Sequence, residues 1–249
     1  MREIVINIDH VSKTYRGNTI PSVRDFSIEV VQGEIFGLLG PNGAGKSTML
    51  NILSGLLPFD CGKITICGFH LPQQMGAIKP LIGVVPQELA LYPAMTAVEN
   101  LMVYGGIYGI NRKELKERIH NLLVYFGLEN SKNRLIKTYS GGMKRRMNLI
   151  AGLLHNPKIL FLDEPTVSVD VQSKALILDN LKELNAQGTT IIYTSHYMEE
   201  AEMLCSRVAF IDEGKLLCKG TPKELIHNSG CENLENLYLK LTGKNLRDG

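Results

Sequence analysis

One short segment restricts the possible folds more than any other part of the sequence. It contains three glycines and ends in a lysine and a hydroxyl: Gly40, Pro41, Asn42, Gly43, Ala44, Gly45, Lys46 and Ser47. An apolar run at 34–39 precedes it, and residues 47–53 follow with helical spacing and no breaker. In such a strand–loop–helix unit, backbone N–H groups and the helix N-terminus bind phosphate oxygens. The segment therefore predicts a phosphate-binding loop in an α/β fold.

Apolar runs with strand character lie on both sides of this loop. Residues 4–9 and 23–31 carry β-branched side chains in partial alternation, which is typical of an antiparallel sheet. Apolar strands return at 159–162 and 190–194, separated by a helical stretch over roughly 172–186. Strands that alternate with helices form βαβ crossover units, so we expect a parallel sheet as well.

A largely helical stretch separates the two strand-rich parts. It begins at Thr96, which forms a capping box with Glu99, and its last helix ends at Pro157. Apolar residues recur at helical spacing at Leu115, Ile119, Leu122, Leu123 and Phe126. We therefore expect an α/β fold, a P-loop NTPase (RecA-like) core with an antiparallel β subdomain and a helical subdomain inserted at about 96–156.

The last part of the sequence predicts a hairpin and one more helix. Residues 207–212 and 215–219 flank a Glu-Gly turn, and the Thr-Pro pair at 221–222 starts a helix. No internal repeat indicates a second, tandem domain. We predict a single domain over 1–228, followed by a short C-terminal tail over 229–249.

Composition argues against several classes of protein. The net charge is only +2, from 27 basic and 25 acidic residues, which is not the basic surface that nucleic-acid binding needs. No stretch reaches the ~20 apolar residues that cross a bilayer, and the first residues do not resemble a secretory signal. The five cysteines lack Cys-x-x-Cys spacing, as expected for reduced thiols in the cytoplasm. We expect no nucleic-acid partner and no direct membrane span.

Two carboxylates follow the apolar strand at 159–162. Asp163 and Glu164 would lie at the carboxyl edge of the sheet, where a nucleoside triphosphatase needs acids beside its phosphate loop. Asp163 is the candidate for holding Mg²⁺, together with the Ser47 hydroxyl. Glu164 is the candidate general base, which takes a proton from the attacking water. Lys46 would neutralise the β- and γ-phosphates.

The segment Tyr139-Ser140-Gly141-Gly142-Met143 separates this chain from other P-loop proteins. It lies directly before an apolar, basic helix and upstream of Asp163. It resembles the Leu-Ser-Gly-Gly-Gln signature of ABC (ATP-binding cassette) ATPases in sequence and in position. Tyr139 and Met143 depart from that signature, whereas its serine and two glycines are kept.

Other elements of that family appear in the same order. Tyr15 resembles the aromatic residue that stacks on adenine, Gln87 the glutamine loop, Asp170 the acid of the D-loop, and His196 the switch histidine. The resemblance implies that Glu164, His196 and Lys46 carry catalysis and that Ser47, Gln87 and Asp163 hold Mg²⁺. It implies ATP contacts from Tyr15, Gly40, Pro41, Asn42, Gly43, Ala44, Gly45, Lys46, Ser47, Thr48, Gln87, Ser140, Gly141, Gly142, Asp170 and His196.

The resemblance also implies two partner chains. In the family, the signature serine and amides bind the γ-phosphate of ATP held by a second cassette, which is either a second copy or a related chain. A separate integral membrane permease uses the energy, so we expect a cytoplasmic location, peripheral on the cytoplasmic face of the cell membrane. The motifs resemble most the bacterial branch that exports drugs and antibiotics. In the family, the permease selects the transported compound.

Two other functions are compatible with single motifs. A non-transport ABC ATPase acting on ribosomes or DNA usually carries tandem cassettes, coiled coils or basic extensions, and this sequence has none of these. A nucleotide-binding regulator without turnover should have lost Lys46, Glu164 or His196, and all three are present. We therefore favour an ATPase that drives transport.

Two further segments have alternative interpretations. Lys144, Arg145 and Arg146 could attract a partner's nucleotide, but a basic triplet on a helix is more often a solvated face, which we favour. The apolar residues between Tyr92 and Tyr108 suit either a groove for a permease helix or the core of the helical subdomain.

Overall fold

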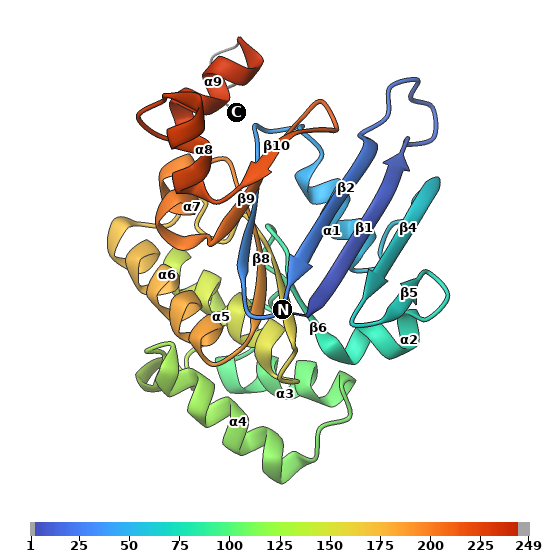
Figure 1. The fold of residues 1–249 in the computed structure, drawn as a ribbon. Coiled ribbons are helices and arrows are strands. Elements are labelled where there is room, and N and C mark those ends of the chain that lie inside the picture. Colours follow the sequence, from blue (N-terminus) through green and yellow to red (C-terminus); the bar gives the residue numbers. More distant parts are fainter. Residues whose placement is uncertain (1–2, 244–249) are drawn as a thin grey trace.

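A largely parallel sheet carries the elements on either side of the glycine-rich loop. The computed structural model of the protein describes residues 3–243 and orders this sheet β10-β9-β3-β8-β7-β6 (Figure 1). All neighbours are parallel except the hairpin of β9 and β10. The strands are β3 (Ile35–Leu39), β6 (Ile82–Val85), β7 (Ile159–Asp163), β8 (Thr190–Ser195), β9 (Arg207–Asp212) and β10 (Lys215–Gly220).

A second, antiparallel sheet packs against this one. Its order is β2-β1-β4-β5, with β1 (Ile4–Lys13), β2 (Val23–Val31), β4 (Cys61–Ile66) and β5 (Phe69–Leu71). Helix α1 (Lys46–Leu53), which follows the glycine-rich loop, shares one buried apolar cluster with both sheets. Ile6 of the antiparallel sheet, Met49 of α1 and Phe161 of the parallel sheet belong to this cluster. The predicted antiparallel subdomain beside a P-loop core is therefore confirmed.

Helices cover the other face of the parallel sheet. They contribute a second apolar cluster, in which Leu149 and Leu181 lie with Leu160 and Tyr193 of the strands. These helices are α5 (Gly141–Leu153), α6 (Val171–Ala186) and α7 (Met198–Leu204).

The predicted helical insertion lies between β6 and β7. It contains α3 (Ala97–Ile107), α4 (Arg112–Tyr125) and α5, with short 3₁₀ helices at Glu129–Ser131 and Ile136–Thr138. Thr96 and Glu99 form the expected capping box, and Leu115, Ile119 and Leu123 are buried. Two shorter segments, α2 (Met75–Ile78) and the 3₁₀ helix Lys79–Leu81, connect the antiparallel sheet to β6.

The expected C-terminal tail contains a helix that sequence reasoning missed. After α8 (Pro222–Ser229), α9 (Leu234–Thr242) packs at the opposite end of the molecule from α3 and α4 (Figure 1). Leu237 and Tyr238 are buried, and the Tyr238 ring lies 6.0 Å from that of Phe210. A nine-residue helix has little stability of its own, so tertiary contacts, which no local pattern reveals, stabilise it. Residues 244–249 of the predicted tail lie outside the described part of the chain.

No helix within residues 3–243 combines the length and the apolar character that crossing a membrane requires.

His155 joins the end of α5 to the parallel sheet and should make stability depend on pH. Its ring stacks on Tyr108 at 3.8 Å between centroids, and its Nε2 donates to the Ile82 carbonyl oxygen at 2.8 Å. Burial lowers the pKa of His155 below its usual 6.5, with Arg118 adding to this effect. The unfolded chain therefore binds the proton more readily, and stability falls as pH drops below about 6.5.

We predict that His155→Gln, which keeps a donor for Ile82 but does not titrate, destabilises the protein more at pH 7.5 than at pH 5.5. Urea unfolding of both chains at both pH values measures this difference, and the other titrating groups cancel between the two chains. A destabilisation that stays constant, or that grows toward pH 5.5, would contradict the assignment.

Candidate nucleotide-binding site

The glycine-rich loop leaves the carboxyl end of β3 in a conformation that its glycines permit. Gly43 and Gly45 have φ of 79° and 110°, and a Cβ at Gly45 would lie 2.4 Å from the Ser22 carbonyl oxygen. Lys46 is 4% exposed, and its Nζ donates to the carbonyl oxygens of Gly40 and Pro41 at 2.8 and 3.0 Å. The ammonium group is therefore held within the loop.

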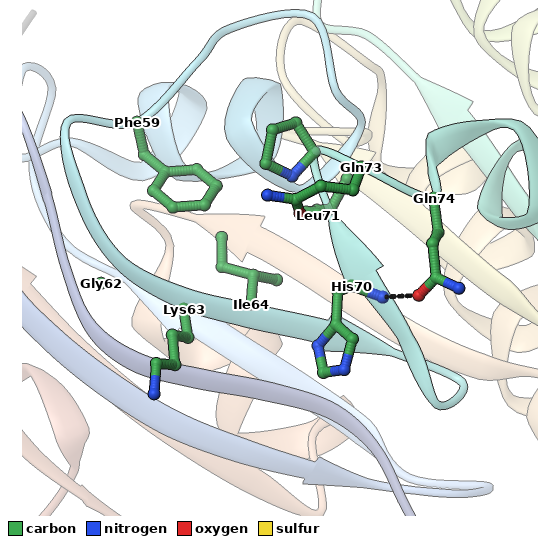
Figure 2. Close-up of a pocket in the computed structure, with 9 residues that line it drawn as sticks. Phe59, Gly62, Lys63, Ile64, His70, Leu71, Gln73 and Gln74 are labelled. Carbon is green, nitrogen blue, oxygen red and sulfur yellow. Dashed lines mark hydrogen bonds between the residues drawn. The ribbon is translucent and has the colours of Figure 1, made fainter.

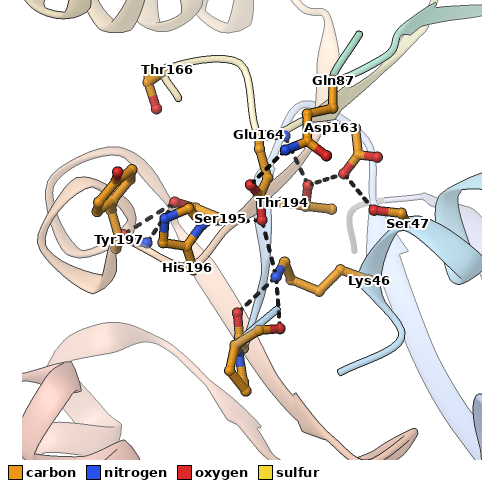
Figure 3. A network of polar contacts seen from close by, with 12 residues as sticks. Lys46, Ser47, Gln87, Asp163, Glu164, Thr166, Thr194, Ser195, His196 and Tyr197 are labelled. Atoms are coloured by element: carbon orange, nitrogen blue, oxygen red, sulfur yellow. Dashed lines mark hydrogen bonds and ion pairs between the residues drawn. The ribbon is translucent and has the colours of Figure 1, made fainter. Parts of the chain in front are cut away.

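Glu164 is the centre of the polar contacts around this lysine (Figure 3). Its side chain is buried, with Oε1 3.1 Å from Lys46 Nζ and 3.1 Å from His196 Nδ1. Gln87 Nε2 donates to the other carboxylate oxygen at 3.4 Å. Four residues predicted to act at the γ-phosphate end of ATP are thus in contact: Lys46, Gln87, Glu164 and His196. They follow the ends of β3, β6, β7 and β8.

Asp163 is held beside the same loop by two hydroxyl groups. Ser47 Oγ donates to Asp163 Oδ1 at 3.2 Å, and Thr194 Oγ1 donates to the same oxygen at 2.8 Å. Thr194 also accepts from the Glu164 amide at 3.0 Å. Glu164 has a φ of 48°, an unusual backbone conformation that costs about 1–3 kcal/mol and occurs often at functional sites. This turn directs the two successive carboxylates to different partners.

A pocket of about 310 Å³ lies over the loop. Its lining includes the predicted residues Asn42, Gly43, Ala44, Gly45, Lys46, Ser47, Thr48, Gln87 and Glu164. Tyr15 lies beside it, half-exposed, with its hydroxyl 3.2 Å from Thr48 Oγ1. The ring is thus adjacent to the first turn of α1, where a base attached to loop-bound phosphates could reach it.

The signature residues occupy a different surface. Ser140 caps α5 by accepting from the Met143 amide at 3.3 Å, and Asp170 caps α6 by accepting from the Ser173 amide at 2.9 Å. The hydrogen bonds from Ser173 lower the pKa of Asp170. The two helix starts touch, because a Cβ at Gly142 would lie 2.2 Å from Ser173 Oγ. Ser140, Gly141, Gly142 and Asp170 do not line the pocket over the phosphate loop.

Comparisons with known proteins agree with these motifs. The profile of the ABC transporter family matches residues 23–167, which is more than half of the chain. The linearmycin resistance ATP-binding protein LnrL of Bacillus subtilis (strain 168) is 46% identical over 97% of this chain and 76% of its own. The Nod factor export ATP-binding protein I of Paraburkholderia xenovorans (strain LB400) is 41% identical, with 94% and 77% covered.

This chain belongs to the ABC transporter family.

Solved structures place it among the ATP-binding subunits of that family. The structure of an ATP-binding subunit of an ABC transporter superposes with a TM-score of 0.85 at 28% identity, covering 96% of this chain and 99% of the other. A dimeric ATP-binding cassette bound to ADP and Pi, in a post-hydrolysis state, gives 0.79 at 27% identity, with 87% and 98% covered. The chain is thus an ABC cassette, an ATP-binding subunit that hydrolyses ATP.

We expected the basic triplet of the cassette's signature helix to form a solvated face, and for its two arginines this prediction is wrong. Arg145 is buried and donates to the Gln87 carbonyl oxygen at 2.8 Å, while Arg146 donates to the Phe126 carbonyl oxygen at 2.7 Å. Burial lowers the pKa of Arg145, and the charges of Asp163 and Glu164 oppose that shift. The sequence did contain a signal for the burial of Arg145. Arg145 lies four residues before the apolar Leu149, so both side chains are on the same face of the helix. Arg145 holds the Gln87 segment in place.

The oxygen donors of the cassette fit Mg²⁺. Ser47 and Gln87 line the pocket, and the Ser47 hydroxyl donates to the Asp163 carboxylate. Among residues 3–243, no group of three His, Cys, Asp or Glu side chains is placed to hold a metal ion. Mg²⁺ takes few protein ligands and completes its octahedron with phosphate and water oxygens, so this donor set suits it.

A larger pocket, of about 590 Å³, lies on the antiparallel sheet of the cassette (Figure 2). Its exposed walls are largely apolar, which does not suit a triphosphate. Its lining consists of Phe59, Gly62, Lys63, Ile64, His70, Leu71, Pro72, Gln73 and Gln74. None of these residues was predicted to bind ATP.

The Tyr15 ring provides a test of where the base of ATP binds. We predict that Tyr15→Ala weakens ATP binding by about 1–3 kcal/mol, the usual contribution of an aromatic ring that stacks on a base. Tyr15→Phe, which loses only the contact with Thr48, should bind ATP nearly as well as the natural chain. Titration with a fluorescent ATP analogue measures both. Unchanged affinity in Tyr15→Ala would rule out stacking, and GTP should bind similarly because stacking reads either purine.

Proposed function

We propose that two cassettes enclose two Mg-ATP molecules, each between the phosphate loop of one chain and the signature helix of the other. The observation that supports this is the split site: Lys46 and Glu164 converge in one pocket, whereas Ser140 and Gly141 lie exposed at the start of α5, outside it. A helix N-terminus attracts anions. Val171, beside Asp170, is 83% exposed, which suits a surface that another chain covers.

The residues of the pocket have separate tasks in hydrolysis. Lys46 neutralises the phosphates, and Ser47, Asp163 and Gln87 would hold Mg²⁺, which supplies charge neutralisation at the phosphates. Glu164 accepts a proton from the attacking water at its Oε1 or Oε2. His196, 3.1 Å from Glu164, hydrogen-bonds the γ-phosphate and orients that water. Because Glu164 is buried, its negative charge is poorly screened and acts strongly on the water.

The cassette drives transport through a separate membrane permease, with export as the direction. The relatives are a linearmycin resistance protein and Nod factor export proteins, all named as ATP-binding proteins. Val103, Ile107 and Tyr108 of α3 and the turn after it are exposed apolar residues, and they form the surface for a permease helix. The location is the cytoplasmic face of the cell membrane.

Two variants should distinguish the residue needed for ATP binding from the residue needed for hydrolysis. We predict that Glu164→Gln keeps ATP affinity and lowers turnover at least ~10²-fold, as expected for loss of a general base. Lys46→Ala should weaken ATP binding itself. Phosphate release and nucleotide titration measure the two effects. Glu117→Gln makes the same chemical change on the exposed face of α4 and is the matched control. Wild-type turnover in Glu164→Gln would show that the base is another residue.

Mixing two inactive variants tests whether the site is shared. Lys46→Ala cannot hold its own phosphates, and Ser140→Arg blocks the signature contact by its bulk. Neither should hydrolyse ATP alone. In a heterodimer of the two, the intact Lys46 of one chain faces the intact Ser140 of the other, while both lesions fall in the second site. We predict that ATPase activity reappears on mixing, measured by phosphate release.

A second mixture is the matched control. Lys46→Ala with Glu164→Gln damages the phosphate-loop half of both sites, so no whole site forms and activity should stay absent. Cross-linking shows in both cases that heterodimers are present. If Lys46→Ala and Ser140→Arg fail to complement although wild-type chain rescues each of them, the site lies within one chain and the two-cassette mechanism is refuted.

A further inference from the structure

A buried carboxylate lies directly behind the ATP pocket. Glu200 is 4% exposed and lies on α7, which begins just after His196. One of its oxygens, Oε2, accepts hydrogen bonds from Thr166 Oγ1 and from the Tyr193 hydroxyl, both at 2.5 Å. The other oxygen, Oε1, lies 2.6 Å from Lys174 Nζ. The sequence motifs assigned no role to this residue.

Two of these three partners come from the segments that carry Glu164 and His196. Thr166 lies two residues after Glu164, in a turn closed by a hydrogen bond from the Val167 amide to the Glu164 carbonyl oxygen at 3.3 Å. Tyr193 lies on β8, shortly before His196. Lys174 lies in the first turn of α6, the helix that Asp170 caps. Figure 3 shows Thr166 on the segment that follows Glu164.

The same lysine also contacts the residue next to His196. Lys174 Nζ lies 4.8 Å from the centroid of the Tyr197 ring, which in turn lies 4.1 Å from the ring of His196. A buried carboxylate is costly unless it is paired and hydrogen-bonded, so Glu200 restrains all three partners. Burial and the adjacent carboxylate raise the pKa of Tyr193 well above its usual value, so its hydroxyl remains a donor.

We propose that Glu200 is a positioning residue that fixes Glu164 and His196 relative to each other. From the helix after His196, its carboxylate contacts the turn after Glu164 through Thr166 and the strand before His196 through Tyr193. Its other oxygen contacts Lys174 at the start of α6. It touches neither ATP nor the attacking water. The inference rests on the catalytic roles proposed above for Glu164 and His196.

Glu200→Gln tests the role with little change of shape. Gln keeps an acceptor for Thr166 and Tyr193, but it has no charge for Lys174. Misplaced catalytic groups should lower turnover and leave binding intact, so we expect kcat of the full chain to fall roughly ten- to hundred-fold while KM for ATP stays within about two-fold. Steady-state ATP hydrolysis gives both parameters, and thermal unfolding is recorded on the same samples.

Glu34→Gln is the matched control. Glu34 is equally buried, is paired with Arg207 at 3.3 Å, and lies before β3 at the end of the sheet opposite the ATP pocket. Glu34→Gln should lower the unfolding temperature and keep kcat within about two-fold of the natural chain. Equal losses of kcat in Glu34→Gln and Glu200→Gln would mean that Glu200 only stabilises the fold, and the proposal would be overturned.

Thr166→Val removes a different contact of the same carboxylate and replaces Glu200→Gln if that variant does not fold. It removes one donor, and we expect the same pattern of lower kcat at nearly constant KM. In the double variant, the two losses of kcat should combine to less than their product, because both changes loosen the same group of contacts around the side chain of residue 200. Multiplied losses would show that Thr166 and Glu200 act separately and would overturn the proposal.

Glu164→Gln is measured in parallel. It shows whether an unexpected result comes from a wrong role for Glu200 or from a wrong catalytic role for Glu164. If Glu164→Gln hydrolyses ATP normally, the catalytic assignment fails. If Glu164→Gln is inactive while Glu200→Gln and Thr166→Val both keep the natural kcat, the catalytic assignment stands and only the positioning role of Glu200 is refuted.

Discussion

The rest of the site depends on one buried pair of opposite charges. The side chains of Lys46 and Glu164 are 4% and 5% exposed, and Nζ and Oε1 are 3.1 Å apart. Removing both charges from water is unfavourable unless other polar groups complete their hydrogen bonding. Carbonyl oxygens of the phosphate loop do this for the ammonium, and Gln87 does it for the carboxylate. The loop, the turn at Glu164 and the Gln87 segment are therefore parts of one arrangement.

The register of the parallel sheet makes that arrangement possible. Leu39 of β3 pairs with Ser195 of β8, and Asp163 of β7 pairs with Thr194 of β8, so all three strands end at the same level. The phosphate loop, the two carboxylates and His196 each follow directly from one of these ends. Thr194, which bonds to Asp163 and to the Glu164 amide, fixes the spacing between two of them. The geometry of the pocket is thus set by backbone pairing before any nucleotide binds.

Sequence could predict those parts of the site that are contiguous in the chain. The phosphate loop and the strand-end carboxylates have local patterns, and the sheet topology brings strand ends together wherever they occur. Thr194 and Glu200 could not be found in this way, because each acts by contacting segments distant in sequence. The same reason applies to α9, since its packing against Phe210 is a tertiary contact. The positions of the residues with local patterns were therefore predictable, whereas the residues that hold them in place were not.

The two halves of the proposed composite site differ in how they are prepared. The phosphate-loop half is preorganised by buried contacts, whereas the signature half is an exposed helix start at Ser140 and Gly141. An exposed helix N-terminus binds an anion well only when the anion is held in front of it. On the proposed mechanism, the γ-phosphate held at Lys46 is that anion, so closure of two cassettes requires ATP. Once the γ-phosphate is cleaved and released, the contact between the chains is lost, and the cassettes separate.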